Sequence, residues 1–246
     1  ADKESVISCL KELGYSKFPS LLDPMVIQEL VEFGLSTPFI LRDMDETKSG
    51  EKRLIFSSSA PKAVAYDAPL EALVECSAVQ GIISDPSLLF LCNEYFGNLP
   101  KLDAISMWWL TAYKQGKADD NAAQKFHYDL ERTKWLKVFF YLSDVGHENG
   151  PHTFVTGSHK TNALPKSILT KNYTRISDQE VATALPDRKI EEFTGPKGMG
   201  FIEDTRGLHK GGIVQNGHRL ILQIQFSTNF FAANLPKIPM PKRITP

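Results

Sequence analysis

Two stretches far apart in the chain carry side chains that could hold a metal ion. The first is Phe126-His127-Tyr128-Asp129. Side chains alternate faces along an extended strand, so His127 and Asp129 should point the same way. A third ligand must come from another strand, and His209 is the best candidate. His127, Asp129 and His209 are therefore the predicted metal ligands and the predicted catalytic group.

Two histidines and one carboxylate on one face of an iron ion leave three positions open, as in non-haem Fe(II) oxygenases. Arg219 opens an apolar strand ten residues after His209. A guanidinium in that place can bind a carboxylate through two hydrogen bonds, and a 2-oxo acid co-substrate offers one at its far end. A lone His-x-Asp is a weak signal, so the prediction depends on the surrounding motifs.

The wider series resembles the phytanoyl-CoA dioxygenase family of 2-oxoglutarate-dependent oxygenases over roughly residues 85–230. The family's His-x-Asp corresponds to His127 and Asp129, its distal histidine to His209, and its 2-oxoglutarate arginine to Arg219. Its Asn-Gly to Pro-Gly-Ser-His motif corresponds to residues 149–159, with threonine at position 156 where the family usually has proline. The resemblance implies an Fe(II)- and 2-oxoglutarate-dependent dioxygenase that uses O2, releases succinate and CO2, and hydroxylates or otherwise oxidises a small-molecule substrate.

Finer roles follow from the same resemblance. Related halogenases lack the carboxylate ligand, so the presence of Asp129 favours hydroxylation over halogenation. Phe139 is predicted to lie against 2-oxoglutarate and Trp108 on the inward face of its strand, although plain core packing explains both positions equally well. The substrate-side candidates are Arg206, His152 and Gln223, and His152 stands where the family usually has an apolar residue.

Three other interpretations stay open. A non-catalytic metal-binding barrel predicts a damaged ligand triad or a missing arginine, and the chain shows neither. A zinc-dependent hydrolase could use the same ligands, but no nearby carboxylate is convincingly placed as its general base. A protein hydroxylase would share the iron chemistry and should show an open groove in place of a closed pocket.

Composition limits the kinds of binding partner and the cellular location expected for this protein. The chain has 246 residues with 28 basic and 29 acidic side chains, a formal net charge of −1. This balance disfavours nucleic acid and anionic membranes as partners. No window approaches the roughly 18 apolar residues of a membrane span, and the first residues are too polar for a signal peptide, so a cytoplasmic protein is expected. Cys9, Cys76 and Cys92 lack metal-type spacing and are predicted to be buried, reduced thiols.

The elements that must position these residues fall into two regions. Residues 1–100 are predicted to be mostly helical, with helices ending at glycine or beginning at Asp-Pro, and to cover one face of a sheet. From residue 101 to 230, short strands separated by turns predict a double-stranded β-helix, which is a jelly roll of the cupin type. Residues 1–246 are expected to form a single domain, with residues 231–246 as a surface arm.

Two segments interrupt these regions. Residues 42–59 are expected to form a polar loop, either solvated or closing over substrate. Residues 161–195 are expected to be an insertion with one short helix, begun by a capping box at Ser177.

The last strand, 219–227, can be interpreted residue by residue. Leu220, Leu222, Ile224 and Phe226 should face the helices, and Arg219, Ile221, Gln223 and Gln225 should face the interior. If residues 208–214 and 219–227 formed a hairpin with a two-residue Asn216-Gly217 turn, Arg219 would lie on the face opposite His209. A three-residue loop at 216–218 or a bulge at Gly211-Gly212 is therefore expected.

Overall fold

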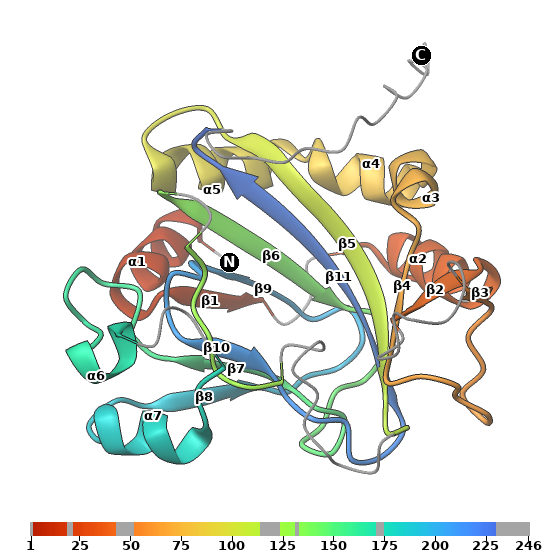
Figure 1. The fold of residues 1–246 in the computed structure, drawn as a ribbon. Coiled ribbons are helices and arrows are strands. Elements are labelled where there is room, and N and C mark those ends of the chain that lie inside the picture. The colour runs from red at the N-terminus through yellow and green to blue at the C-terminus, as the bar shows by residue number, and fades with distance from the viewer. Residues whose placement is uncertain are drawn as a thin grey trace.

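A computed structural model describes residues 2–18, 22–42, 52–113, 124–130, 133–170 and 175–229. Its architecture has three layers: helices, a large antiparallel sheet and a small antiparallel sheet (Figure 1). The helices are α1 (Lys3–Leu13), α2 (Pro24–Ser36), α3 (Leu70–Glu75), α4 (Ser77–Ile83), α5 (Pro86–Phe96), α6 (Lys166–Leu169) and α7 (Asp178–Ala184).

The large sheet has eight strands in the order β1-β9-β6-β11-β5-β4-β2-β3, and every pairing in it is antiparallel. Their bounds are β1 (Tyr15–Phe18), β2 (Phe39–Arg42), β3 (Arg53–Leu54), β4 (Ala65–Asp67), β5 (Lys101–Thr111), β6 (Trp135–Tyr141), β9 (Gly200–Glu203) and β11 (His218–Ser227). The small sheet has the order β10-β7-β8, formed by β10 (His209–Gly211), β7 (His152–Val155) and β8 (Ile190–Phe193).

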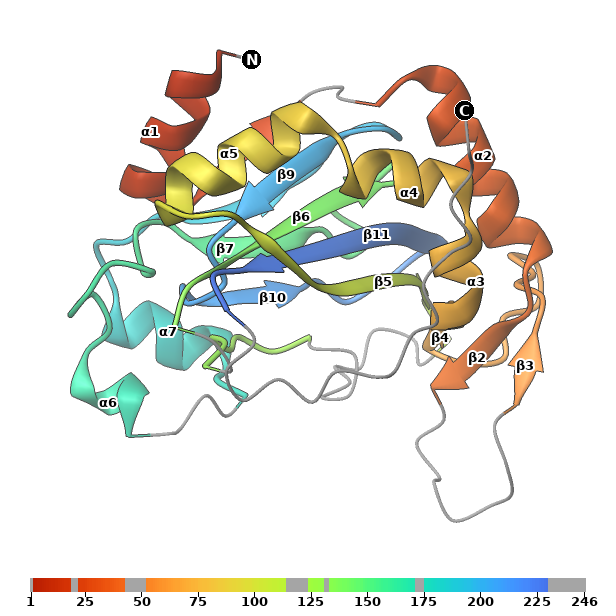
Figure 2. The same ribbon diagram turned by 90° about the horizontal axis from the view of Figure 1, so that it is seen from above.

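Helices α1 to α5 lie along one face of the large sheet (Figure 2). Their apolar sides pack on outward residues of β6 and β11, including Val138, Leu220 and Leu222. The ends follow the expected signals: Asp23 and Asp85 accept backbone hydrogen bonds at the starts of α2 and α5. Gly14 and Gly97 adopt a left-handed backbone, with φ of 92° and 76°, where α1 and α5 end.

A second core lies between the two sheets. It joins Phe139, Tyr141 and Phe201 of the large sheet to Phe154 and Phe193 of the small sheet. The predicted jelly roll, backed by N-terminal helices, therefore describes the molecule well. Within the described residues, no helix has the length and apolar character needed to cross a membrane.

Several boundaries differ from the sequence-based expectation. Residues 1–100 are not only helical, because β1 to β4 add both edges of the large sheet. Within the helical region, residues 70–83 form two helices, α3 and α4, separated by the extended backbone of Cys76. The predicted insertion contributes β8 to the small sheet as well as two short helices, α6 and α7, the latter with the expected capping box. All three cysteines are free, Cys76 and Cys92 being buried and Cys9 partly exposed.

The predicted hairpin between residues 208–214 and 219–227 is wrong. Strand β10 pairs with β7 in the small sheet, whereas β11 pairs with β5 and β6 in the large one. The intervening residues follow the segment before β7: Gly212 N donates to Pro151 O at 2.8 Å, and Val214 forms a bridge with Asn149. His209 and Arg219 therefore reach the interior from two different sheets, and neither a bulge nor a longer turn is required.

Candidate functional site

The three predicted metal ligands converge at one point between the sheets. One potential ligand atom from each of His127, Asp129 and His209 lies within 4.8 Å of the other two. His209 Nε2 is 3.9 Å from Asp129 Oδ2, and the two imidazole centroids are 4.2 Å apart. Two neutral imidazoles and one carboxylate form a donor set suited to a divalent transition metal.

The segment that carries His127 and Asp129 is extended, but it is not a regular strand. It is held by single bridges from Phe126 to Ile176 and from His127 to His209. The alternation of side chains still applies, because Phe126 and Tyr128 are buried in a cluster with Val181 of α7. His127 and Asp129 consequently point the other way, towards His209. A short bridged segment thus takes the place of the predicted metal-ligand strand, and His127 and Asp129 still point to the same side.

Each histidine of the triad is oriented through its second ring nitrogen. The Nδ1 of His127 lies 2.9 Å from Lys125 O, and the Nδ1 of His209 lies 2.9 Å from Gly207 O. A carbonyl can only accept, so Nδ1 carries the hydrogen and donates it in both rings. The Nε2 atoms are left with free lone pairs, which is the arrangement of metal-ligating histidines whose outer nitrogen is fixed by a carbonyl.

Electrostatics favour the protonation states that a metal needs. Burial and the neighbouring His209 lower the pKa of His127 to about 2. Burial also lowers the pKa of His209, so both rings are neutral at pH 7. Burial alone would raise the pKa of Asp129, but the Lys137 ammonium outweighs it and holds that pKa well below its usual range. The Lys137 ammonium donates to Asp129 Oδ2 at 2.6 Å.

A cavity of about 260 Å³ adjoins the triad. Both sheets contribute to its walls. His152, His209 and Gly211 belong to the small sheet, and His127 lies on the bridged segment outside both sheets. The large-sheet residues are Arg42, Asp67, Ser106, Trp108, Lys137, Phe139, Arg219, Ile221 and Gln223. Trp108, Phe139 and Gln223 thus face the space between the sheets, and their roles towards 2-oxoglutarate or substrate stay predictions.

Arg219 is the most unusual residue in this cavity. Its side chain is 2 % exposed, and its Nε and Nη1 atoms have no hydrogen-bond partner among the described residues. Burial lowers the pKa of Arg219, and the nearby Tyr141 hydroxyl acts in the opposite direction. Among the described residues, the Arg219 guanidinium thus keeps two buried donors without an acceptor, which is a costly arrangement that an anionic group could relieve.

The alternation of β11 explains how Arg219 comes to point inward. Leu220, Leu222 and Ile224 face the helices and belong to that core. Arg219, Ile221 and Gln223 face the other way and line the cavity. Phe139, opposite Gln223 on the adjacent strand β6, stacks on Phe201 with centroids 4.8 Å apart and gives the cavity an apolar wall.

The motif at residues 149–159 has a structural role close to the site. The Ser158 hydroxyl accepts from Leu208 N at 2.8 Å and donates to Val155 O at 2.6 Å, so it fixes the chain immediately before His209. Asn149 donates to Asn216 O at 3.0 Å and thereby ties down the link between β10 and β11. Gly150, with φ of 68°, approaches the backbone of Gly212 so closely that a Cβ would meet Gly212 O at 2.4 Å.

Other expected residues lie away from the cavity. Arg206 binds Asp204 through Nη2 and Nε, at 2.5 and 2.9 Å, and is not among the residues that line the cavity. His147 is exposed and pairs with Glu192, whereas His159 is largely buried against Lys11 O. Half of the predicted 42–59 loop, residues 43–51, lies outside the described residues. Its first residue, Arg42, ends β2 and lines the cavity in a bidentate pair with Asp67.

The structure adds residues that the sequence did not indicate. Glu203, at the end of β9, is completely buried and lies 2.9 Å from His152 Nε2 through its Oε2 atom. Lys137, Arg42 and Asp67 also line the cavity, and no sequence motif marked them as site residues. The alternation of β6 could have placed Lys137 inward, since it shares a face with Phe139. Glu203 gave no signal, because a carboxylate at the end of a strand is usually exposed.

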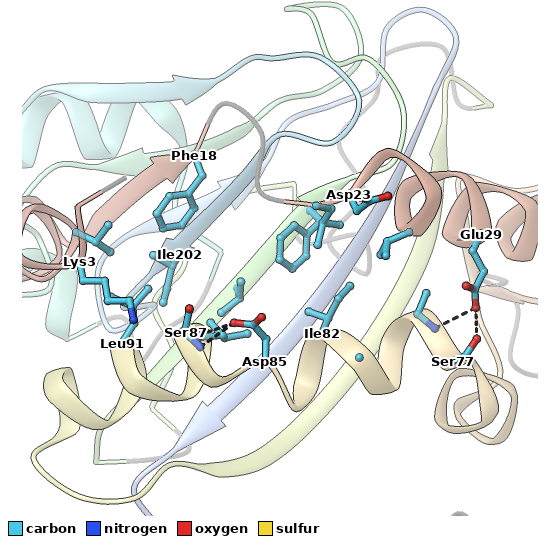
Figure 3. A pocket seen from close by; sticks show the side chains of 18 residues that line it. Lys3, Phe18, Asp23, Glu29, Ser77, Ile82, Asp85, Ser87, Leu91 and Ile202 are labelled. Atoms are coloured by element: carbon cyan, nitrogen blue, oxygen red, sulfur yellow. Dashed lines mark hydrogen bonds between the residues drawn. The ribbon is translucent and has the colours of Figure 1, made fainter. Parts of the chain in front are cut away.

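A larger cavity of about 660 Å³ lies on the other side of the large sheet, beneath the helices (Figure 3). Its lining is largely apolar and includes Phe18 and Ile202 from the sheet and Ile82 from α4. Two of its carboxylates are engaged at helix starts: Glu29 accepts from Ala78 N at 3.0 Å, and Asp85 accepts from Ser87 N at 2.9 Å. The chemistry-bearing side chains thus gather in the smaller cavity between the sheets.

Comparison with known proteins gives structural neighbours only. No protein-family model matches the chain, and no curated protein matches it. SnoN, a non-heme alpha ketoglutarate dependent epimerase from nogalamycin biosynthesis, is similar with a TM-score of 0.63 and 16% identity, covering 99% of this chain and 94% of SnoN. EctD from S. alaskensis with bound Fe has a TM-score of 0.63 and 12% identity, covering 98% and 85%.

A third neighbour is HygX from Streptomyces hygroscopicus, solved with nickel, 2-oxoglutarate and hygromycin B. Its TM-score is 0.62 at 15% identity, with 93% of this chain and 88% of HygX covered. At these identities the similarity shows the fold, and it confirms the predicted jelly roll. The chain therefore shares its overall architecture with SnoN, EctD and HygX.

Proposed function

We propose that this protein is an Fe(II)- and 2-oxoglutarate-dependent dioxygenase that hydroxylates or otherwise oxidises a small molecule and releases succinate and CO2. Arg219 carries the proposal: a buried guanidinium with unpaired Nε and Nη1 atoms lines the same cavity as His127 and His209. The motifs shared with the phytanoyl-CoA dioxygenase family and the cofactors of EctD and HygX support it. Membership of that particular family is part of the proposal.

His127, Asp129 and His209 would hold the iron, and their donor set fits it, because both Nε2 lone pairs are free and the carboxylate is ionised. When bound, the iron supplies activation of O2 coupled to decarboxylation of the 2-oxo acid. Arg219 would bind the far carboxylate of 2-oxoglutarate through its guanidinium group, whose Nε and Nη1 donors are otherwise unpaired among the described residues. The apolar surface of Phe139 and Ile221 beside it would exclude water from the methylene chain of the co-substrate.

The remaining cavity wall would receive the substrate. Arg42, Asp67, Ser106 and Gln223 give this part a polar lining of balanced charge, because Arg42 and Asp67 form an ion pair. A cavity of this size suits a small polar molecule; HygX was solved with hygromycin B bound, and SnoN comes from nogalamycin biosynthesis. Asp129 fills the carboxylate position on the metal, so hydroxylation is favoured over halogenation.

Anaerobic titration tests the proposal directly. Fe(II) and then 2-oxoglutarate are added to the metal-free protein, and the metal-to-ligand absorption band of the chelate is recorded. The parent should develop the band, whereas Arg219→Lys should require a much higher 2-oxoglutarate concentration at nearly unchanged iron affinity, because lysine keeps the charge but loses the planar fork.

Two results would contradict the proposal. A parent protein that binds iron without developing the band would be a metal site of another kind, such as a non-catalytic barrel. An Arg219→Lys variant that binds 2-oxoglutarate as tightly as the parent would remove the co-substrate role of Arg219. The exposed pair Lys160–Glu12 offers a control, since Lys160→Met removes a cation far from the cavity and should change neither titration.

A further inference from the structure

A second buried polar pair crosses the interior beside the triad. His152 Nε2 and Glu203 Oε2 are 2.9 Å apart, with side-chain exposures of 7% and 0%. His152 belongs to β7 in the small sheet and Glu203 to β9 in the large sheet, so the pair joins the two walls of the cavity. The proposed binding of iron and 2-oxoglutarate uses neither residue.

Packing alone does not account for this pair. The His152 ring lies among aromatic rings, with centroids 5.2 Å from Phe139, 5.1 Å from Phe201 and 5.6 Å from Phe193. An apolar side chain would fill such a space at lower cost, because buried polar pairs often stabilise a fold less than hydrophobic residues of similar volume. Glu203 Oε1 has no hydrogen-bond partner among the described residues, which adds to the cost. A polar pair kept in this environment points to a role towards a ligand.

The position of His152 indicates which part of the ligand it meets. Its backbone N–H donates to the Tyr141 hydroxyl at 2.9 Å, and the same hydroxyl is the group that engages the Arg219 side chain. His152 and Arg219 both line the cavity. Gly211 stands opposite His152 in the β10–β7 register and brings no side chain to this place. The His152 ring therefore lies near Arg219 and also stacks on the ring of His209, with centroids 5.7 Å apart, so it stands between the arginine and the triad.

We propose that His152, held in orientation by Glu203, is a second anchor for the far carboxylate of the 2-oxo acid, acting beside Arg219. This inference rests on the proposed function and extends it. The Nε2 edge of the ring faces Glu203, which leaves Nδ1 as the ring atom available to a ligand. Burial raises the pKa of Glu203 to about 8, so the neutral carboxyl donates to Nε2 and the ring hydrogen resides on Nδ1, ready to donate to an anion.

Matched co-substrates separate this role from plain packing. 2-Oxoglutarate and 2-oxopentanoate have the same chain length, but the second ends in a methyl group and offers no far carboxylate. Their dissociation constants are measured by anaerobic titration of the Fe(II)-loaded protein. His152→Leu, a change to an apolar side chain of similar volume, should weaken 2-oxoglutarate binding about tenfold or more, the effect of a lost hydrogen bond to a charged group. Binding of 2-oxopentanoate and of Fe(II) should stay within about twofold of the parent.

Glu203 variants test the orienting role. Glu203→Gln keeps a group that can donate to His152 Nε2, so 2-oxoglutarate should bind within about threefold of the parent. Glu203→Leu leaves the ring unheld and should repeat the loss of selectivity seen with His152→Leu. The matched control is His159→Leu, which replaces another largely buried histidine of the same motif, one bonded to Lys11 O outside the cavity. It should leave the ratio of the two dissociation constants unchanged.

Each alternative outcome overturns the inference. Equal weakening of both acids in His152→Leu would show that the ring only packs, and no weakening would show that it makes no contact. A raised KM for the oxidised substrate at unchanged 2-oxoglutarate affinity would place His152 on the substrate side. Arg219→Lys, titrated in parallel, tests the proposed function separately from the role of His152. If Arg219→Lys weakens 2-oxoglutarate binding and His152→Leu does not, the proposed function stands and this inference fails.

Discussion

His127 and His209 exchange both of their backbone hydrogen bonds, His127 N donating to His209 O at 3.0 Å and His209 N to His127 O at 2.9 Å. Residues paired in this way lie directly opposite each other, and their side chains leave the backbone on the same face. Two proposed metal ligands separated by about eighty residues in sequence are thus fixed by one reciprocal contact. The third proposed ligand, Asp129, follows two residues after His127, and its backbone N–H donates to Thr205 O at 2.9 Å.

Removal of the carboxylate ligand should abolish metal binding without unfolding the chain. In Asp129→Ala the two imidazoles remain, but the negative donor that balances the divalent ion is lost. We expect the thermal stabilisation by Fe(II) or Ni(II), measured under argon by circular dichroism, to disappear, together with 2-oxoglutarate turnover. Addition of a chelator should lower the Tm of the metal-loaded parent to its metal-free value and leave the variant unchanged. Retained turnover in Asp129→Ala would exclude it as a ligand.

Lys137 should matter most when no metal is present. Its ammonium bonds to Asp129, and Lys137→Met would leave that buried carboxylate without its cation at a cost of around 3–5 kcal/mol of unfolding free energy. A bound divalent ion would supply the missing positive charge, so the metal-induced rise in stability should be larger in the variant than in the parent. Urea unfolding with and without Ni(II) measures both quantities. An unchanged metal-free stability would refute the importance of the pair.

The buried carboxyl of Glu203 predicts a specific pH dependence. Burial raises its pKa from 4.5 to about 8, so its contribution to the stability of the metal-free fold is complete below pH 4.5 and is lost as the pH rises through 8. The buried histidines, whose pKa values are lowered, act in the opposite direction below pH 6.5. The histidines are the same in both proteins, so the difference in unfolding free energy between Glu203→Gln and the parent reports the ionisation of Glu203 alone. That difference should shift in favour of the variant as the pH rises from 5 to 8, and a constant difference would contradict the raised pKa.

Ser158 should stabilise both the fold and the metal centre. In Ser158→Ala the buried backbone N–H of Leu208 loses its acceptor, which should lower the free energy of unfolding by about 1–3 kcal/mol. Because Leu208 precedes His209, the same change should reduce the metal-induced shift in Tm. Ser84→Ala is a suitable control, since that hydroxyl bonds to Gln80 O at an exposed helix end. Equal behaviour of the two serine variants would show that Ser158 has no special role.

Features set by neighbouring residues were predictable from the sequence. Asp-Pro pairs and glycines marked the ends of α1, α2 and α5, and the alternation along β11 separated its helix-facing side from its cavity-facing side. Features set by pairing between distant residues were not predictable in the same way. The partner of β10 is β7, and nothing near residues 209–211 distinguishes this from the expected hairpin with β11. Glu203, for example, finds its buried partner in His152, which is 51 residues away in the chain but beside it in space.

The separation of β10 and β11 into different sheets has a consequence for the choice of 2-oxo acid. The triad draws His209 from the small sheet, and Arg219 belongs to the large one. For the proposed co-substrate, the spacing between the sheets therefore sets the number of carbons that fit between the metal and the guanidinium. That spacing is fixed by close-packed aromatic side chains such as Phe154, Phe193 and Phe201, and such interiors yield little. Four-carbon oxaloacetate should be too short to reach both ends and six-carbon 2-oxoadipate too long, so the aromatic core would serve as the gauge that selects the five-carbon diacid.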